Sequence, residues 1–75
     1  MNQRTLYYAG WFVNVLVFEQ DVHILYKDGD EWTEWGAIPR PEWDEQEAIV
    51  CQRLFRHLDK FEFSRLRLGL DYDPY

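Results

Sequence analysis

The feature that most constrains the fold is one amphipathic segment, Pro41–Phe61, whose apolar residues recur at helical spacing. At about 100° per residue they form a single stripe, and the charged residues fall on the other side. Pro41 suits the first helical position, where its missing N–H costs nothing. Acids fill the first turns and bases the last ones, in agreement with the helix dipole. The segment therefore predicts a helix whose covered stripe consists of Trp43, Val50, Cys51, Leu54, Leu58 and Phe61.

The chain before this helix is predicted to form strands. The run Arg4–Phe18 is rich in β-branched and aromatic residues, which favour strands. Fully extended it would span roughly 50 Å, which is long for a small domain. We therefore expect a bulge or a sharp bend near Ala9 and Gly10. A second strand is predicted over Val22–Tyr26.

The dipeptide Asp28-Gly29 is the strongest turn signal in the chain, because it suits the two positive-φ positions of a type I′ hairpin turn. In that register Leu25 faces Trp32. A three-residue loop at 19–21 then joins the first strand to the second. This register predicts one sheet face with Phe12, Leu16, Phe18, Val22, Ile24, Tyr26 and Trp35, and a reverse face with Trp11, Val13, Val15, Val17, Leu25 and Trp32. A loop of another length would exchange the two faces of the first strand.

The segment Phe61–Leu70 fits two structures. Leucines at 66, 68 and 70 alternate with Arg65, Arg67 and Gly69, as in a half-buried strand, whereas the apolar spacing from Leu58 onward is also helical. We favour the strand. The predicted fold is then a single α+β domain over residues 1–75 in β-β-β-α-β order. It has a small antiparallel sheet, one helix packed on one face and a loosely ordered tail at 71–75.

The reverse face of this predicted sheet is too apolar for a surface that meets water. One helix cannot cover both faces, and exposed apolar patches usually mark interaction sites. We therefore predict a non-enzymatic protein-interaction domain, most simply a homodimer that covers this face. Its interface would contain Trp11, Val13, Val15, Val17, Leu25 and Trp32.

The formal net charge of −6 is concentrated in one part of the chain. More than half of the acids lie between Asp28 and Glu47, where Arg40 is the only base. This distribution disfavours direct nucleic-acid binding, which needs a cationic surface. It suits either a solvated face or docking on a basic partner. The alternative function is an inhibitor or decoy that presents Asp28, Asp30, Glu31, Glu34, Glu42, Asp44 and Glu45 to a basic, nucleic-acid-binding surface.

The sequence contains no pattern typical of catalysis or metal binding. His23, Cys51 and His57 lack the spacing of metal ligands, and the four glycines are isolated. We expect no enzymatic activity and no cofactor. A further alternative is a binder of organic cations, held by Trp11 and Trp32 with a nearby carboxylate.

The single cysteine and the N-terminal apolar run bear on location. A lone cysteine excludes an intramolecular disulfide and fits a reducing compartment. The run Leu6–Phe18 is too short to span a bilayer, and no cleavage site of small residues follows it. We therefore expect a cytoplasmic protein without a membrane segment.

Overall fold

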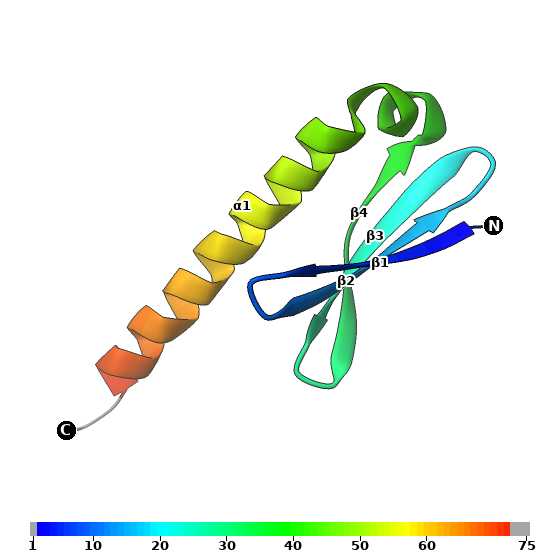
Figure 1. Ribbon diagram of the computed structural model, residues 1–75. Helices are drawn as coiled ribbons and strands as arrows, with labels where there is room; N and C mark the ends of the chain where they lie inside the picture. Colours follow the sequence, from blue (N-terminus) through cyan, green and yellow to red (C-terminus); the bar gives the residue numbers. More distant parts are fainter. Residues whose placement is uncertain (1, 73–75) are drawn as a thin grey trace.

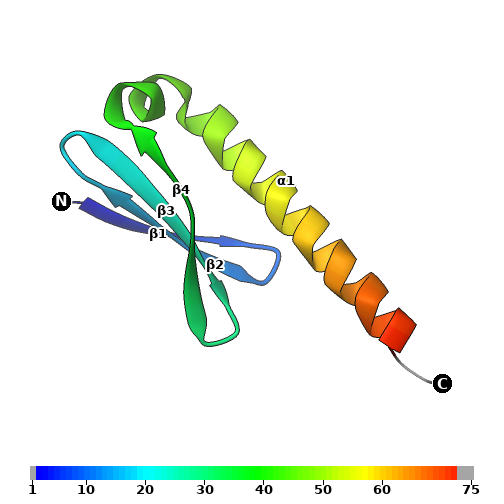
Figure 2. The same cartoon turned by 180° about the vertical axis from the view of Figure 1, so that it is seen from behind.

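The computed structural model describes residues 2–72, with side-chain surroundings described for residues 2–63. One antiparallel sheet has its strands in sequence order, and a single long helix lies across one of its faces (Figures 1 and 2). The elements are β1 (Asn2–Tyr8), β2 (Trp11–Val17), β3 (Asp21–Asp28), β4 (Glu31–Pro39) and α1 (Arg40–Tyr72). The predicted α+β class, with a helix on one sheet face, is confirmed. The order is β-β-β-β-α, with one strand more before the helix than predicted.

The predicted first strand is in fact two strands that meet at Ala9 and Gly10, where the break was expected. Both residues have positive φ, +48° and +90°, as a type I′ turn requires. Tyr8 pairs with Trp11 directly across this turn. Glycine adopts such a conformation freely, whereas for Ala9 it costs about 1 kcal/mol.

The turn between β2 and β3 is one residue shorter than predicted. The backbone N–H of Phe18 donates to the carbonyl of Asp21 at 2.8 Å, so only the two residues between them lie outside the ladder. Neither of these two has positive φ, which explains why the sequence carries no glycine signal here. A shift of one residue exchanges the two faces of β2. The side chains that face α1 are therefore Trp11, Val13 and Val15, and those that face away include Phe12 and Leu16.

The predicted hairpin between β3 and β4 is present, but its register differs by two residues. Asp28 pairs with Glu31, so Gly29 and Asp30 form the turn. Gly29 alone has positive φ, +65°, as in a type II′ turn rather than the predicted type I′ turn. A shift of two residues keeps each side chain on its predicted face.

β4 contains a bulge at Trp35. The pairing passes from Leu25–Glu34 to Ile24–Gly36 and leaves Trp35 without an opposite residue in β3. A bulge restarts the in-and-out alternation of a strand. Trp35 and Ile38 therefore both pack against the core, although they are three positions apart, which in a regular strand would place them on opposite faces.

α1 corrects the prediction for residues 61–70, whose backbone is helical and not a strand. The helical spacing continues through this segment, and no proline or glycine interrupts it before Gly69. A kink at Gln46, with φ −126° and ψ 30°, separates residues 40–45, about two turns, from the rest of the helix. Phe63 is 65% exposed, and the last turns of α1 extend past the end of the sheet (Figure 1).

The core lies between α1 and the sheet face formed by the buried side chains of β2 and β3. From the helix it takes Trp43, Val50, Leu54 and Leu58, with Cys51 and Phe61 partly buried beside them, which confirms the predicted stripe. Trp11 meets Tyr26 and Phe61 edge to face at centroid distances of 5.7 and 5.8 Å. Each such pair stabilises the fold by about 0.5–1.5 kcal/mol beyond the area that it buries.

Arg40 fastens the β2–β3 turn to the start of α1. Its backbone N–H donates to the carbonyl of Gln20 at 2.9 Å. Its guanidinium donates to the carbonyl of Phe18 at 2.9 Å and to the carboxylate of Asp44 at 3.1 Å. One residue thus holds both sides of the turn that sets the register of β2. No helix within residues 2–72 combines the length and the apolarity needed to cross a bilayer.

Replacing Ala9 by Asn should stabilise the protein by about 0.5–1 kcal/mol, because Asn tolerates positive φ and Asn-Gly is the preferred type I′ pair. The control is Gly10→Ala, which should lower the free energy of unfolding by about 1–2 kcal/mol. An alanine at φ +90° has a strained backbone even though its Cβ would meet no other atom. Urea unfolding measures both. Equal midpoints for all three proteins would contradict this turn.

Replacing Arg40 by Ala should lower the free energy of unfolding by about 1 kcal/mol, because the carbonyl of Phe18 loses a charged donor. Arg53→Ala removes the same charge from an exposed helical position and should change it by less than about 0.5 kcal/mol. Urea unfolding of both variants tests the difference. Equal losses would mean that the removed charge, and not the lost hydrogen bond to the β2–β3 turn, lowers the stability.

Candidate interaction surface

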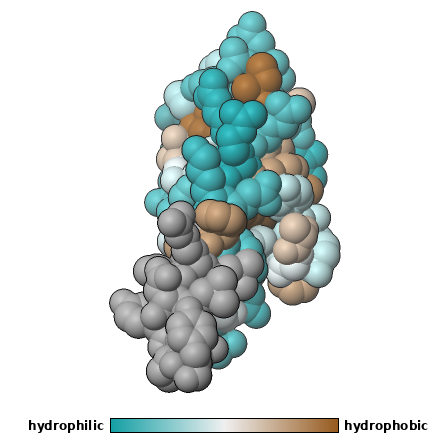
Figure 3. Space-filling view, turned by 90° about the vertical axis from the view of Figure 1, so that its left-hand side faces the viewer, coloured by the Kyte–Doolittle hydropathy of each residue, from teal (hydrophilic) through white to brown (hydrophobic). Residues whose placement is uncertain are grey.

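The sheet face that points away from α1, called the open face below, carries large apolar side chains. Tyr7 is 67% exposed, Phe12 48% and Trp32 42%. Phe18 is also exposed, and Leu16 and Leu25 lie half-buried between them. In contrast, the coloured part of the side of the molecule seen in Figure 3 is mainly hydrophilic. The open face consists of Tyr7, Phe12, Leu16, Phe18, Leu25 and Trp32.

The strand register arranges the open face in rows. Tyr7 opposes Phe12, with ring centroids 5.1 Å apart, and Lys27 opposes Trp32. The β2–β3 pairing brings these two pairs side by side. One end of the sheet therefore presents a row that is aromatic except for the stem and ammonium of Lys27.

The middle row of the open face is polar on β1 and β2, where it consists of Thr5 and Asn14, and continues through Leu25 on β3. The hydroxyl of Thr5 donates to Oδ1 of Asn14 at 3.1 Å. Asn14 is also the residue that could have predicted the register. In the three-residue loop it would lie under the helix, where an amide needs buried hydrogen-bond partners. The observed register places it where Thr5 and water can satisfy it.

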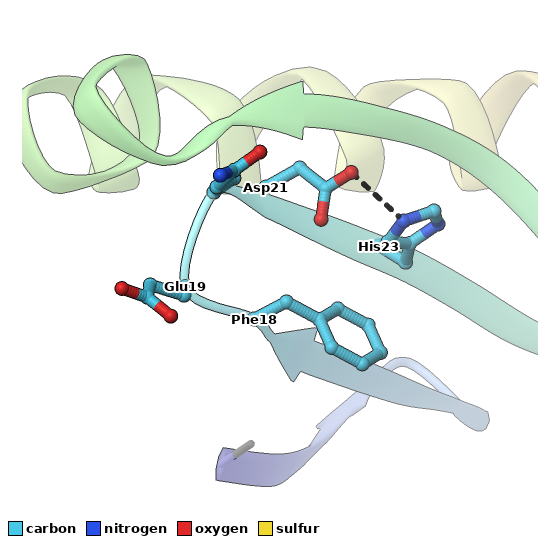
Figure 4. Close-up of a pocket in the computed structure, with 5 residues that line it drawn as sticks. Phe18, Glu19, Asp21 and His23 are labelled. Atoms are coloured by element: carbon cyan, nitrogen blue, oxygen red, sulfur yellow. Dashed lines mark ion pairs between the residues drawn. The ribbon is translucent and has the colours of Figure 1, made fainter.

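A shallow hollow of about 430 Å³ lies at the other end of the open face, beside the β2–β3 turn. Figure 4 shows its lining and the ion pair between Asp21 and His23. The ring of Phe18 packs edge-on to the imidazole at a centroid distance of 5.3 Å. The hollow thus adds an aromatic wall and a charged pair to the apolar surface. It is lined by Phe18, Glu19, Gln20, Asp21 and His23.

His23 lies between two carboxylates. Its Nδ1 is 2.5 Å from Oε1 of Glu34, and its Nε2 is 3.3 Å from Oδ2 of Asp21. The hydrogen bond with Glu34 raises the pKa of His23 above its usual value, and the charge of Asp21 raises it further, against an opposing effect of desolvation. The imidazolium form offsets negative charge at this end of the open face.

The predicted interface is wrong for the residues that the shorter turn moved. Trp11, Val13 and Val15 are buried under α1, so no partner can contact them, and Val17 packs against the edge of the same core. Leu25 and Trp32 lie on the uncovered face, as predicted. The apolar surplus therefore lies on that face of the sheet, but β2 and its turn contribute Phe12, Leu16 and Phe18 to it.

The acids proposed as a docking surface fall into two groups. Asp28, Asp30 and Glu31 lie at the β3–β4 turn, and Glu42, Asp44 and Glu45 lie at the start of α1. The nine residues of β4 separate the groups by roughly 30 Å. Glu34 lies between them on the open face and is engaged by His23. The fold therefore provides two small acidic patches, not one continuous surface.

The predicted site for an organic cation is not formed, because its two tryptophans lie on opposite faces of the sheet. Trp11 is buried under α1 and Trp32 is on the open face. Cys51 is half-buried, and desolvation, followed by the charge of Glu47, raises the pKa of its thiol, which disfavours a reactive thiolate. Among the side chains described, those of residues 2–63, no three His, Cys, Asp or Glu residues are grouped so that they could hold a metal ion.

Comparison of the chain with protein-family models, with curated proteins and with solved structures found no match. The function must therefore be inferred from the geometry of the open face and of the sheet edges.

The stabilisation from His23 should depend on pH. A folded-state pKa above the unfolded value of about 6.5 means that the contribution is complete below about pH 6.5 and is lost as pH rises through the folded pKa. His23→Gln should therefore lower the thermal midpoint more at about pH 5.5 than at about pH 9. In a Glu34→Gln background this pH dependence should shrink. A difference between wild type and His23→Gln that is constant with pH would contradict the assignment.

Proposed function

We propose that this chain is a small, non-enzymatic protein-interaction domain that self-associates through the open face of its sheet. The observation that carries the proposal is the row formed by Tyr7, Phe12 and Trp32, exposed on a face that no element within residues 2–72 covers. Exposed aromatic groups of this size are typical of interface centres. The single cysteine suits the cytoplasm as the place of this function.

The dimensions of the sheet indicate how strong this association is. Four strands at about 4.8 Å and seven residues at about 3.3 Å give a face of roughly 20 by 23 Å. Two such faces packed together bury about 900 Å² or somewhat more, which is below the roughly 1,200–2,000 Å² of stable specific interfaces and in the range of weak, transient ones. We therefore expect a concentration-dependent dimer and not an obligate one.

The charge distribution is compatible with a second copy as the partner. The net charge of −6 opposes self-association, but many of the acids lie away from the open face, at the β3–β4 turn and at the start of α1. On the open face, Asp21 and Glu34 are both paired with His23. Added salt should screen the remaining repulsion and strengthen the dimer, whereas it would weaken docking of an acidic patch on a basic partner.

The alternative function, an acidic inhibitor or decoy, has less support from the geometry. A basic, nucleic-acid-binding surface would have to engage two acidic patches separated by the length of β4. Each patch alone offers few charges, and exposed ion pairs contribute little. We therefore favour the open face.

Phe12→Ser should weaken self-association at least about tenfold, because it removes the aromatic group at the centre of the exposed row. Ile49→Ser is the matched control, since Ile49 is 47% exposed and Phe12 48%, but Ile49 lies on the outer side of α1. Sedimentation equilibrium over a range of concentrations measures the dissociation constants, and circular dichroism confirms that both variants fold.

Two results would overturn the proposal. One is a wild-type chain that keeps the monomer mass of 9.2 kDa at every concentration tested. The other is a dimer that Phe12→Ser and Ile49→Ser weaken equally. Trp32→Ser, at the other side of the row, provides a second open-face variant that must behave like Phe12→Ser.

A further inference from the structure

The two edges of the sheet differ in how open they are to pairing. β4 carries the bulge at Trp35, contains Pro39 and continues directly into α1, and such features prevent another strand from pairing. β1 has seven residues in regular register with β2 and contains neither proline nor glycine. The backbone of α1 lies closest to β3 and β4, so the helix leaves the outer side of β1 accessible.

The turn at Ala9 and Gly10 fixes which backbone groups of β1 point outward. In a two-residue hairpin the residues that flank the turn, here Tyr8 and Trp11, form a hydrogen-bonded pair. Every second residue of β1 then bonds to β2, and the residues between them direct N–H and C=O away from the sheet. Gln3, Thr5 and Tyr7 therefore offer three donors and three acceptors along the free edge.

We propose that β1 pairs antiparallel with β1 of a second copy, about a two-fold axis at Thr5, to form one continuous eight-stranded sheet. In this register Thr5 opposes Thr5 of the second copy, and Gln3 opposes its Tyr7. All the outward N–H and C=O groups of both chains then find partners, which gives six backbone hydrogen bonds. This association uses the edge of the sheet, so it goes beyond the proposed role of the open face.

The charges of β1 favour a second copy over a basic peptide. β1 contains no acid, and its one charged residue, Arg4, pairs with Glu47 on α1 and lies over the ring of Trp43. A cationic peptide would find no counter-charge in this strand. In the two-fold register Arg4 opposes Leu6 of the second copy and not its Arg4, so no like charges face each other across the new ladder.

The position on the two-fold axis allows a sharp test. Thr5→Lys and Thr5→Glu each place two like charges face to face, so each variant alone should raise the dissociation constant at least about tenfold. Mixing the two variants should restore the dimer, because opposite charges then meet at the axis. Because the side chain of Thr5 lies on the open face, the matched control is Asn14→Lys, its neighbour on β2: it adds the same charge to that face without reaching the edge and should leave edge pairing unchanged. Sedimentation equilibrium of each protein and of the mixture provides the masses.

A second variant keeps the test independent of charge. Thr5→Pro removes an N–H that β2 does not use, so the monomer should fold, as judged by circular dichroism, but its edge cannot pair. The proposal is overturned if both Thr5→Pro and Thr5→Lys retain the wild-type dissociation constant, or if the mixture of the Lys and Glu variants associates no more strongly than either variant alone. A dimer that Phe12→Ser weakens and Thr5→Pro does not would assign association to the open face alone.

Discussion

The two-residue turn between β2 and β3 decides which side chains this sheet buries. One more residue in that turn would place Asn14 under α1 and expose Val13 and Val15. Each large apolar side chain in the core contributes roughly 1.5–3 kcal/mol, and a buried amide without partners costs about as much. The hydrogen bond between Phe18 and Asp21 and the clamp by Arg40 hold the turn at this length. The packing of α1 on the sheet therefore depends on the β2–β3 turn, which is itself exposed.

Features with a strong local signal could be predicted from the sequence. The helix stripe from Trp43 to Phe61 follows from periodicity, because a single period of 3.6 describes both the sequence and the buried face. The break at Ala9 and Gly10 and the hairpin at Gly29 follow from the backbone freedom of glycine together with a strand length that a small domain cannot use. The apolar surplus on the uncovered face also follows, since one helix covers one face only.

The length of the β2–β3 turn and the structure of residues 61–70 could not be predicted in the same way, because in each case the sequence fits two local structures. The β2–β3 turn uses no positive φ, so residues 19 and 20 do not reveal its length, and Tyr7, Phe12, Leu16 and Phe18 were missed as surface residues. Only Asn14 indicated the register. Residues 61–70 satisfy both a period of two and a period of 3.6. In the structure all four strands come before the helix, and residues 61–70 continue α1.

The bulge at Trp35 has a consequence for how the sequence can change in length. It converts the odd spacing between Trp35 and Ile38 into two inward positions. Deleting one residue at 36 or 37 would make this spacing even, so both side chains would stay inward in a regular strand without the bulge. Insertions of two residues at the tip of the β3–β4 hairpin would leave every inward position unchanged. Lineages that carry this fold should therefore accept pairs of added residues at Gly29 and Asp30 and the loss of one residue at the bulge, whereas a single added residue at the hairpin tip should be rejected.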